Sequence, residues 1–401
     1  MMKGRNGQWK ATKIGEHLDI QTGFPFKSQK YVDDPLGIRL LRGDNIVQGK
    51  LRWEGVKRWP EDDASNFDKY SLQAGDVVLA MDRPWIEAGL KYAWITERDL
   101  PCLLVQRVSR LRGRNGLLTP YIRYVIGHHS FTDYVKGIWT GVAVPHISES
   151  QIRAFEFRLP PVGTQVRIIN ILSTYDDLIE NNTRRIKILE QMAQMLYRER
   201  FVNFRFPGHE KVRMVDSVLG PIPEGWDATT LGNVLTLEYG KALKEADRNG
   251  GPIPVYGSSG VVGHHSEKLT SGPGIIVGRK GNVGSVFFCR SDFWVIDTAY
   301  YVRSDLSLYF LYFDLLTQNF LNNDAAVPGL NRNQAHSLPL IRPGSEQLRT
   351  FGRIVEPMFD LKRCLETRNT NLRTTRDLLL PKLISGEVPV EAAEEAMEHT
   401  A

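Results

Sequence analysis

One apolar pattern occurs twice in this chain, and it restricts the folds that the chain can adopt. Between Gln165 and Phe201, the side chains of one helical face recur at alternating steps of four and three residues. This spacing is typical of the a/d seam of a coiled coil, which is stable only when another helix covers it. The seam positions are Ile168, Leu172, Tyr175, Ile179, Asn182, Ile186, Leu189, Ala193 and Leu196. The pattern therefore predicts a long helix in the middle of the chain and a partner helix elsewhere.

The second copy of the pattern lies between Gln347 and Ser385. Apolar side chains recur there every seven residues, and each stands 183 positions after a seam residue of the first helix. They are Phe351, Met358, Leu365, Leu372 and Leu379, which correspond to Ile168, Tyr175, Asn182, Leu189 and Leu196. Two unrelated amphipathic helices in one core are the poorer explanation, because self-similarity at a fixed offset indicates duplication.

Two residues depart from the seam pattern. Pro357 lacks a backbone N–H and clashes with the preceding turn of a helix, so we expect the second helix to begin in earnest near Met358. Asn182 places an amide on the apolar face of the first helix. The pattern does not define the partner of this amide.

The globular parts of the chain are also repeated. The motif W-x-A-T-x-[IL]-G occurs at Trp9–Gly15 and again at Trp226–Gly232, and residues 143–151 are similar to residues 326–334. Each half is therefore expected to consist of a globular module followed by a long helix. The predicted borders are 1–160 for the first module, 161–205 for the first helix, 206–225 for a Pro- and Gly-rich linker, 226–342 for the second module, 343–388 for the second helix and 389–401 for an acidic disordered tail.

Within the modules, apolar runs bounded by turn residues predict short strands. These runs lie at 23–28, 38–46, 70–80, 154–159, 274–278 and 285–289. Residues 120–134 are expected to form a helix. Its His128–His129 pair has no further His or Cys at ligand spacing, so we expect no metal site there.

Composition narrows the class of protein. No run approaches the roughly 18 apolar residues of a membrane span, and the N-terminus lacks the apolar core of a signal peptide, so we expect a cytoplasmic protein with no membrane contact. The three cysteines are far apart and odd in number, which supports neither a disulfide framework nor a zinc cluster. The net charge of +5 is compatible with a polyanionic partner, although many enzymes are equally basic.

The glycine-rich segment Gly278–Gly284 suggests phosphate binding, but it lacks the G-x-G-x-x-G and G-K-[ST] patterns of nucleotide sites. Arg279 and Lys280 on this turn suit DNA phosphates or guanine edges, and an ordinary solvated hairpin explains them equally well. The chain has no G-x-S-x-G elbow, no cluster of carboxylates at nuclease spacing and no Asn-Pro-Pro-aromatic motif of amino-methylating enzymes. The sequence therefore predicts recognition rather than catalysis.

Loop residues of both modules are candidate DNA contacts, because their side chains carry donors and acceptors that match base edges. The candidates are Arg42, Asp44, Asn45, Arg83, His146 and Ser148 in the first module, and Arg279, Lys280, Asn282, Asn331 and Arg332 in the second. Each is also compatible with a polar loop residue that is simply solvated. The basic stretch Arg107–Arg114 has two equal interpretations, which are a track for phosphates and the outer face of an edge strand.

Taken in order, these features resemble the specificity subunit of type I restriction-modification systems. The motifs that carry the resemblance are 23–28, 72–78, 144–148 and 159–165 in the first half, and 278–284, 327–331 and 381–387 in the second. Each motif is weak alone, but their order, found twice over, is specific. The resemblance covers nearly the whole chain, from Trp9 to about Val388.

The resemblance implies an α+β fold in which two α/β target-recognition domains are separated by two long antiparallel coiled-coil helices, with a pseudo-two-fold internal repeat. Each domain would recognise one half of a bipartite, asymmetric site in double-stranded DNA. The coil and partner interface would comprise Ile168, Leu172, Ile179, Ile186, Leu189, Leu196, Met358, Leu365, Leu372 and Leu379.

The resemblance also assigns catalysis to partner subunits. Two modification subunits would methylate adenine from S-adenosylmethionine, and two restriction subunits would use ATP and Mg to translocate and cut DNA, while this chain would bind no cofactor. Three alternatives stay open at this point. They are the recognition half of a bipartite enzyme that combines restriction and methylation, a coiled-coil adaptor that does not bind DNA, and an enzyme with an unfamiliar site.

Overall fold

The computed structural model describes residues 9–138, 145–320 and 329–398. The first residues of the repeated segments 143–151 and 326–334 lie outside this description. The chain forms two compact units, one made of Met1–Asn181 with Asn369–Ala401 and the other of Asn182–Arg368. These units do not follow the predicted borders at 160 and 342, because one half of each long helix belongs to each unit.

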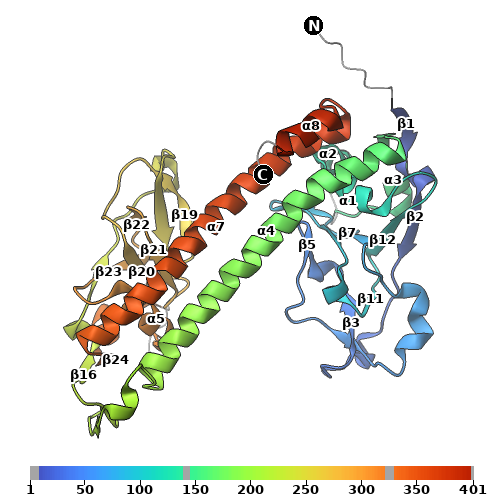
Figure 1. Ribbon diagram of the computed structural model, residues 1–401. Helices are drawn as coiled ribbons and strands as arrows, with labels where there is room; N and C mark the ends of the chain where they lie inside the picture. The colour runs from blue at the N-terminus through green and yellow to red at the C-terminus, as the bar shows by residue number, and fades with distance from the viewer. Residues whose placement is uncertain (1–8, 139–144, 321–328, 399–401) are drawn as a thin grey trace. The chain divides into compact units, whose positions relative to one another are not determined.

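The first unit contains a four-stranded sheet, a three-stranded sheet and a terminal strand pair (Figure 1). The larger sheet has the order β10 (Tyr92–Trp94), β7 (Val77–Ala80), β12 (Val108–Gly113) and β2 (Leu18–Thr22). The smaller sheet consists of β11 (Cys102–Leu104), β3 (Ile38–Leu41) and β6 (Arg58–Trp59). The separate strand pair consists of β1 (Lys10–Lys13) and β13 (Glu156–Leu159). Two short hairpins are β4 (Ile46–Val47) with β5 (Lys50–Leu51), and β8 (Trp85–Ile86) with β9 (Gly89–Leu90).

The helices of the first module are α1 (Thr119–Gly127), α2 (His129–Gly137) and α3 (Glu149–Ala154). The prediction of one helix over 120–134 is wrong at His128, whose extended backbone separates α1 from α2. The His128 ring accepts a hydrogen bond from the backbone N–H of Ser130 at 3.2 Å, and thereby caps α2. Buried side chains of α1 and α2 pack with the start of α4 in one hydrophobic cluster.

The second unit repeats this plan. Its larger sheet has the order β17 (Thr236–Tyr239), β23 (Ala299–Arg303), β20 (Gly274–Gly278) and β21 (Val286–Cys289). The smaller sheet consists of β19 (Gly260–His265), β18 (Ile253–Gly257) and β22 (Trp294–Val295). The separate terminal pair consists of β16 (Asp227–Thr230) and β24 (Pro339–Arg342). Its helices are α5 (Leu308–Thr317) and α6 (Arg332–Ser337), and the linker forms the strands β14 (Met214–Val215) and β15 (Ile222–Pro223).

The two sheets correspond strand for strand. The order β2-β12-β7-β10 matches β17-β23-β20-β21, and both smaller sheets combine one parallel with one antiparallel pair. The pair β1–β13 likewise matches β16–β24. The duplication predicted from the sequence is therefore confirmed in the topology, and the fold is a mixed one of helices and strands with two repeated domains.

The two long helices are α4 (Val162–Tyr197), which ends in a π-helical turn at Arg198–Val202, and α7 (Ser345–Ser385). In the first unit, Arg376 donates to Asp176 at 2.7 Å, and the amide of Asn369 donates to the carbonyl of Ile179 at 3.4 Å. In the second unit, Lys362 lies 2.6 Å from Glu190. Since residue numbers rise along α4 while those of their partners fall along α7, the helices are antiparallel in each unit.

Pro357 does not interrupt α7, so the prediction of a start near Met358 is wrong. Pro357 is exposed, as is Arg353 one turn earlier. The carbonyl that loses its helical donor at this point therefore lies on a solvent-exposed face, where water satisfies it.

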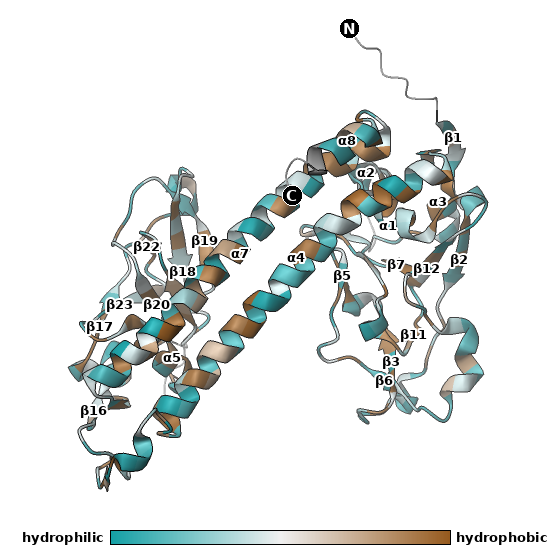
Figure 2. Cartoon of the chain, in the orientation of Figure 1, coloured by the Kyte–Doolittle hydropathy of each residue, from teal (hydrophilic) through white to brown (hydrophobic). Residues whose placement is uncertain are grey.

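The seam is buried unevenly. Ile168, Leu172, Ala193 and Leu365 are at most 2% exposed, and Ile179 is 8% exposed. Among the other predicted seam positions, Asn182 and Phe351 are 6% and 0% exposed. The remaining ones are only half-buried, and they are Tyr175, Ile186, Leu189, Leu196, Met358, Leu372 and Leu379. Both helices change between hydrophobic and hydrophilic residues along their length (Figure 2). With two helices, each seam residue is covered by the facing helix on one side, and its other side stays accessible.

The acidic end of the chain is helical, so the prediction of a disordered tail at 389–401 is wrong for α8 (Val390–Glu398). Val390 and Ala393 are buried in the cluster that contains the start of α4. Arg167 forms ion pairs with Glu391 and Glu394, which explains why an acidic segment is stable here. Residues 399–401 lie outside the described part of the chain.

Candidate nucleic-acid interface

The basic turn of the second module connects β20 to β21, as the sequence predicts, and it is held on two sides. The backbone N–H groups of Arg279 and Lys280 donate to the carbonyl of Thr298 at 2.9 and 3.0 Å. The carbonyl of Arg279 accepts from the N–H of Leu330 at 2.8 Å. The backbone that carries Arg279 is therefore fixed both by the connection between β22 and β23 and by the segment before α6.

The guanidinium groups of Arg279 and Arg332 meet at one aromatic ring. Their central carbons lie 5.0 and 5.1 Å from the ring centroid of Tyr239, which is 49% exposed at the end of β17. Tyr300 supports this ring edge-on, with centroids 5.1 Å apart. Cation–π attraction therefore holds two cationic groups against an accessible tyrosine. Tyr239 was not among the predicted site residues.

The remaining candidates of the second module differ in whether their side chains already have hydrogen-bond partners. Asn331 caps α6, because its side-chain oxygen accepts from the N–H groups of Asn333 and Gln334 at 2.9 and 3.2 Å. Asn282 and Lys280 are exposed. Within residues 145–320 and 329–398, the side chains of Asn282 and Lys280 make no hydrogen bond or ion pair.

In the first module, Arg42 and Asp44 form an ion pair at 3.2 Å near the end of β3. Asn45 is 6% exposed and both ends of its amide are used, since it accepts from the N–H of Arg42 and donates to the carbonyl of Arg52, each at 3.0 Å. Asn45 therefore has a structural role in place of the predicted contact with a base.

Two further cations share this region and were missed in the sequence. Burial lowers the pKa of Lys91, Asp44 raises it, and the neighbouring Arg83 and Arg52 lower it further. Arg52 also donates to the carbonyl of Asp44 at 3.4 Å. Only the tertiary fold brings these side chains together with Arg42, because they come from three separate loops.

Arg83 and His146 lie on two segments that an isolated β-bridge joins through Asp82. His146 Nδ1 is 2.6 Å from one carboxylate oxygen of Asp82, and Arg107 donates to the other at 2.7 Å. Arg83 is exposed and adopts a left-handed backbone with φ of 44°. Ser148 caps α3 by accepting from the N–H of Gln151 at 3.2 Å, so its hydroxyl already has a structural role.

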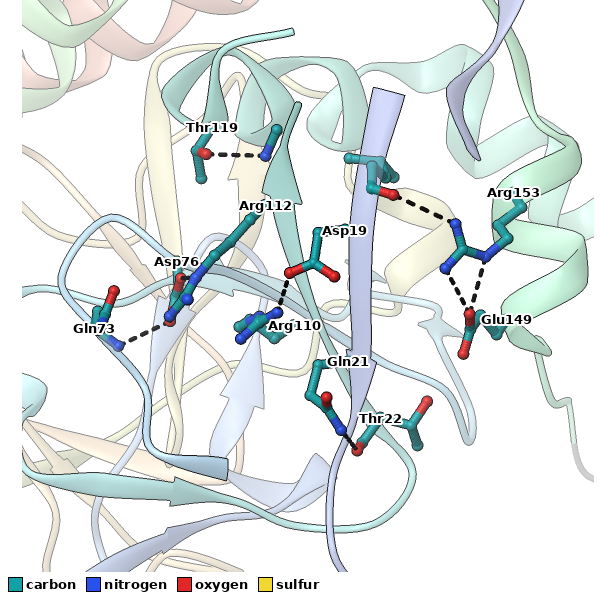
Figure 3. A network of polar contacts seen from close by, with 12 residues as sticks. Asp19, Gln21, Thr22, Gln73, Asp76, Arg110, Arg112, Thr119, Glu149 and Arg153 are labelled. Carbon is teal, nitrogen blue, oxygen red and sulfur yellow. Dashed lines mark hydrogen bonds and ion pairs between the residues drawn. The ribbon is translucent and has the colours of Figure 1, made fainter. Parts of the chain in front are cut away.

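The interpretation of the basic stretch Arg107–Arg114 as an edge strand is wrong, and Arg110 and Arg112 within it are engaged with carboxylates. Most of it forms β12, which is an interior strand between β7 and β2. Arg110 pairs with Asp19, and Arg112 makes two hydrogen bonds to Asp76, whose side chain is 3% exposed (Figure 3). The hydrogen bonds that Arg112 donates to the Asp76 carboxylate raise the pKa of Arg112. Arg110 and Arg112 therefore neutralise carboxylates of the same sheet, whereas Arg107 and Arg114 are exposed.

No metal-binding cluster of three or more His, Cys, Asp or Glu side chains occurs in the part of the chain that the structure describes. The His128–His129 pair is accounted for by the cap of α2, and burial lowers the pKa of His128 to about 4. None of the described helices is both long and apolar enough to cross a membrane.

A pocket of about 300 Å³ lies in the second unit between α4, α5 and α7. The predicted interface residues Leu189 and Met358 line it, together with Tyr312, Phe359 and the ion pair of Glu190 and Lys362. Half-buried seam residues therefore border an accessible apolar hollow on the helices.

Comparison with known proteins agrees with this geometry. The family model described as the type I restriction modification DNA specificity domain matches residues 6–191 and 223–372. The specificity subunit of the type I restriction enzyme EcoAI of Escherichia coli is 35% identical over 188 residues, which cover 46% of this chain and 31% of that subunit. The specificity subunit of MjaVIII of Methanocaldococcus jannaschii is 28% identical over 189 residues, which cover 47% of this chain and 44% of that subunit. The chain thus spans less than half the length of these two curated relatives.

Among solved structures, the S subunit of a type I restriction-modification system from M. genitalium has a similar fold. The TM-score is 0.62 at 18% sequence identity, and the match covers 96% of this chain and 98% of that chain. At this identity the likeness establishes the shared fold.

Proposed function

The chain belongs to the family of type I restriction-modification DNA specificity domains, and on this premise we propose that it recognises a bipartite, asymmetric DNA site for a type I restriction-modification complex. Residues 1–160 would recognise one half-site and residues 226–342 the other. The long helices would connect the two domains and carry the partner subunits.

One structural observation supports this proposal above all. In each module, the segment after the third strand of the large sheet is bridged to the segment before a short capped helix, through Asp82–His146 in the first and Lys280–Gly329 in the second. The frame is the same in both, but the side chains on it differ. Two unlike surfaces on one frame suit the recognition of two unlike half-sites.

We assign the chemistry to partners in this proposal. Two modification subunits would methylate adenine from S-adenosylmethionine, and two restriction subunits would use ATP and Mg to translocate and cleave DNA. This chain would position them and bind no cofactor itself. A cytoplasmic location stays a prediction from the sequence.

The helices offer a surface for such partners. Ile188, Met192 and Met195 recur at helical spacing on α4 and are 45%, 45% and 62% exposed. Apolar side chains arranged along one exposed helix face are typical of protein interfaces. Together with the half-buried seam residues, they support the proposed docking of modification subunits on the coil.

The test is selection of DNA by the purified full-length chain from a pool of random-sequence duplexes at several salt concentrations. We expect enrichment of two short sequences at a fixed separation, with an affinity that falls linearly on a logarithmic salt scale because counterions are released. Enrichment of no sequence, with no salt-dependent affinity, would contradict the proposal and favour a coiled-coil adaptor that does not bind DNA.

A further inference from the structure

The registers of the two large sheets identify equivalent positions in the two modules. Ser109 on β12 pairs with Thr22 and Leu79, and Tyr300 on β23 pairs with Tyr239 and Val277. Moving two residues along from Leu79 and Val277 leads to Met81 and Arg279. The trio Thr22, Ser109 and Met81 therefore corresponds to the trio Tyr239, Tyr300 and Arg279.

Side-chain contacts support this correspondence independently. In the first module, the hydroxyls of Ser109 and Thr22 lie 3.1 and 4.0 Å from the sulfur of Met81. In the second, the guanidinium of Arg279 lies 5.0 and 5.7 Å from the ring centroids of Tyr239 and Tyr300. Each trio is thus a local cluster at the same place in its sheet.

The chemistry of the two clusters is opposite. Ser109 and Met81 are 0% and 6% exposed, so the first cluster closes the end of its sheet with small hydroxyls and a thioether. In the second, a half-exposed phenol ring carries a guanidinium. Packing of the sheet does not require this exposed aromatic surface, since the first module folds without one.

Arg332 reaches the same ring from a second element. It is the first residue of α6, and α6 is tied to β17 because the ring of His336 accepts from the N–H of Leu237 at 3.1 Å. Arg332 has no hydrogen-bond or ion-pair partner in the residues that the structure describes. Arg279 uses one donor for the carbonyl of Asp297 at 3.0 Å, and Asp297 itself is exposed.

We propose that Arg279 and Arg332, held on the ring of Tyr239, recognise guanine in the half-site that the second module reads. This inference rests on the proposed DNA-binding function. The planar guanidinium fork pairs with O6 and N7 of guanine, which is the commonest specific contact in the major groove. Stacking on Tyr239 orients both forks before DNA arrives and so reduces the entropy that binding removes.

The experiment uses the full-length chain and the duplex selected by it from a random pool. R279K and R332K keep the positive charge but lose the fork, so each is expected to weaken binding to that duplex by roughly 5- to 150-fold while leaving nonspecific binding and its salt dependence unchanged. Replacing the relevant guanine by 7-deazaguanine, which lacks the N7 acceptor, should weaken the wild-type chain and leave the corresponding variant unaffected.

R303K is the matched control. Arg303 also lies over a tyrosine of β23, with its guanidinium 5.4 Å from the ring of Tyr301, but it pairs with Thr236 at the other end of β17. It should bind the selected duplex as the wild type does. Y239L, which removes the ring but neither arginine, should reduce discrimination between guanine and 7-deazaguanine without lowering the melting temperature.

Three outcomes would overturn the inference. One is a half-site without guanine at any position that depends on these arginines. Another is a uniform loss of affinity for all sequences in R279K and R332K, which would show that the two side chains do not discriminate between bases. The third is that neither variant changes the binding of the selected duplex, as expected if the arginines contact phosphates through their charge alone. If the wild-type chain selects no sequence, the proposed function itself fails; if it selects two half-sites that neither variant alters, only this inference fails.

Discussion

The two modules share a strand order but differ in how each is attached to the long helices. The first module packs on the helices through its hydrophobic cluster and adds a polar network, in which Asp176 of α4 accepts hydrogen bonds from Arg376 of α7 and from the hydroxyl of Tyr124 at 2.7 and 3.0 Å. The second is joined by aromatic packing, with Tyr197 stacked on Phe313 at 5.7 Å and close to Phe351. A duplicated frame therefore tolerates two different kinds of attachment.

The modules also differ at the edge that we assign to DNA. The turn from β20 to β21 is short, whereas the corresponding connection from β7 to β10 contains the additional hairpin β8–β9. Several side chains on these connections are exposed, such as Arg83, Lys280 and Asn282, so their substitution costs little stability, whereas Met81 and Leu90 belong to the core. The strand order of the sheet is therefore the same in both modules, while the residues on the connections between strands can differ.

The largest effect is expected from truncation of the aromatic attachment. Phe351→Ala removes a ring that is 0% exposed and should lower the free energy of unfolding by about 3–5 kcal/mol, through lost burial and the cavity left behind. Chemical denaturation measures this change. The control is Leu361→Ala on the same helix, where the side chain is 40% exposed; equal losses in both variants would refute the distinction between buried and exposed faces of α7.

A somewhat smaller loss is expected in the polar attachment. Asp176→Ala leaves Arg376 and Arg123 without their shared acceptor, and the Asp176 side chain is 12% exposed, so about 3 kcal/mol should be lost. Glu180→Ala on the same helix breaks the exposed pair with Arg98 and should cost under about 1 kcal/mol. If the two variants unfold alike, the network does not hold the first module to the helices.

The second module should also carry a distinctive dependence on pH. Burial raises the pKa of Asp314 to about 6, while hydrogen bonds from Gln318 and Tyr197 oppose the shift. Because the folded state holds this proton more tightly than the unfolded state, the contribution to stability is present below pH ~4 and is lost as the pH rises through about 6. The full change is about 2–3 kcal/mol.

Asp314→Asn isolates this contribution from the other carboxylates. The difference in unfolding free energy between wild type and variant should change with pH between about 4 and 6 and be flat above about 7. A difference that does not vary with pH would show that Asp314 titrates normally in the folded chain.

The smallest effect concerns α8. Arg167→Met removes the ion pairs with Glu391 and Glu394, all three of which are partly solvated, so global stability should hardly change. Hydrogen exchange in Val390–Glu398 should nevertheless become faster, because α8 then loses its ion pairs with α4 and keeps the packing of Val390 and Ala393. Arg167→Lys, which keeps a charge, should give intermediate protection; unchanged exchange in both variants would exclude a role for these pairs.

The repeated parts of the fold could be predicted because they depend on local pattern. The heptads of the long helices are repeated 183 positions on, as at Leu189 and Leu372, and the motif at Trp9 is repeated 217 positions on at Trp226; both repeats are present in the structure. The strand Gly274–Gly278 and the turn at Arg279 were also predictable, since an apolar run ending in glycines defines a hairpin.

The failed predictions concern residues whose role depends on distant partners. Arg110 and Arg112 have the alternation of an exposed strand face, but Asp19 and Asp76, which are far away in the sequence, neutralise them. Asn45 is a different case, because its amide bonds to Arg42 and Arg52 of its own loop and is buried there. The role of Tyr239 was missed because Arg279 and Arg332 meet at its ring only after the sheet and α6 have formed.

The most direct test of two independent readers on one frame is exchange of a module. Residues 9–155 are replaced by the corresponding domain of another member of the family, and the DNA sequences selected by the full-length chimera are compared with those of the original chain. We predict that one half-site changes completely while the other, which depends on Arg279 and Arg332, is retained. A change in both half-sites, or in neither, would contradict the account.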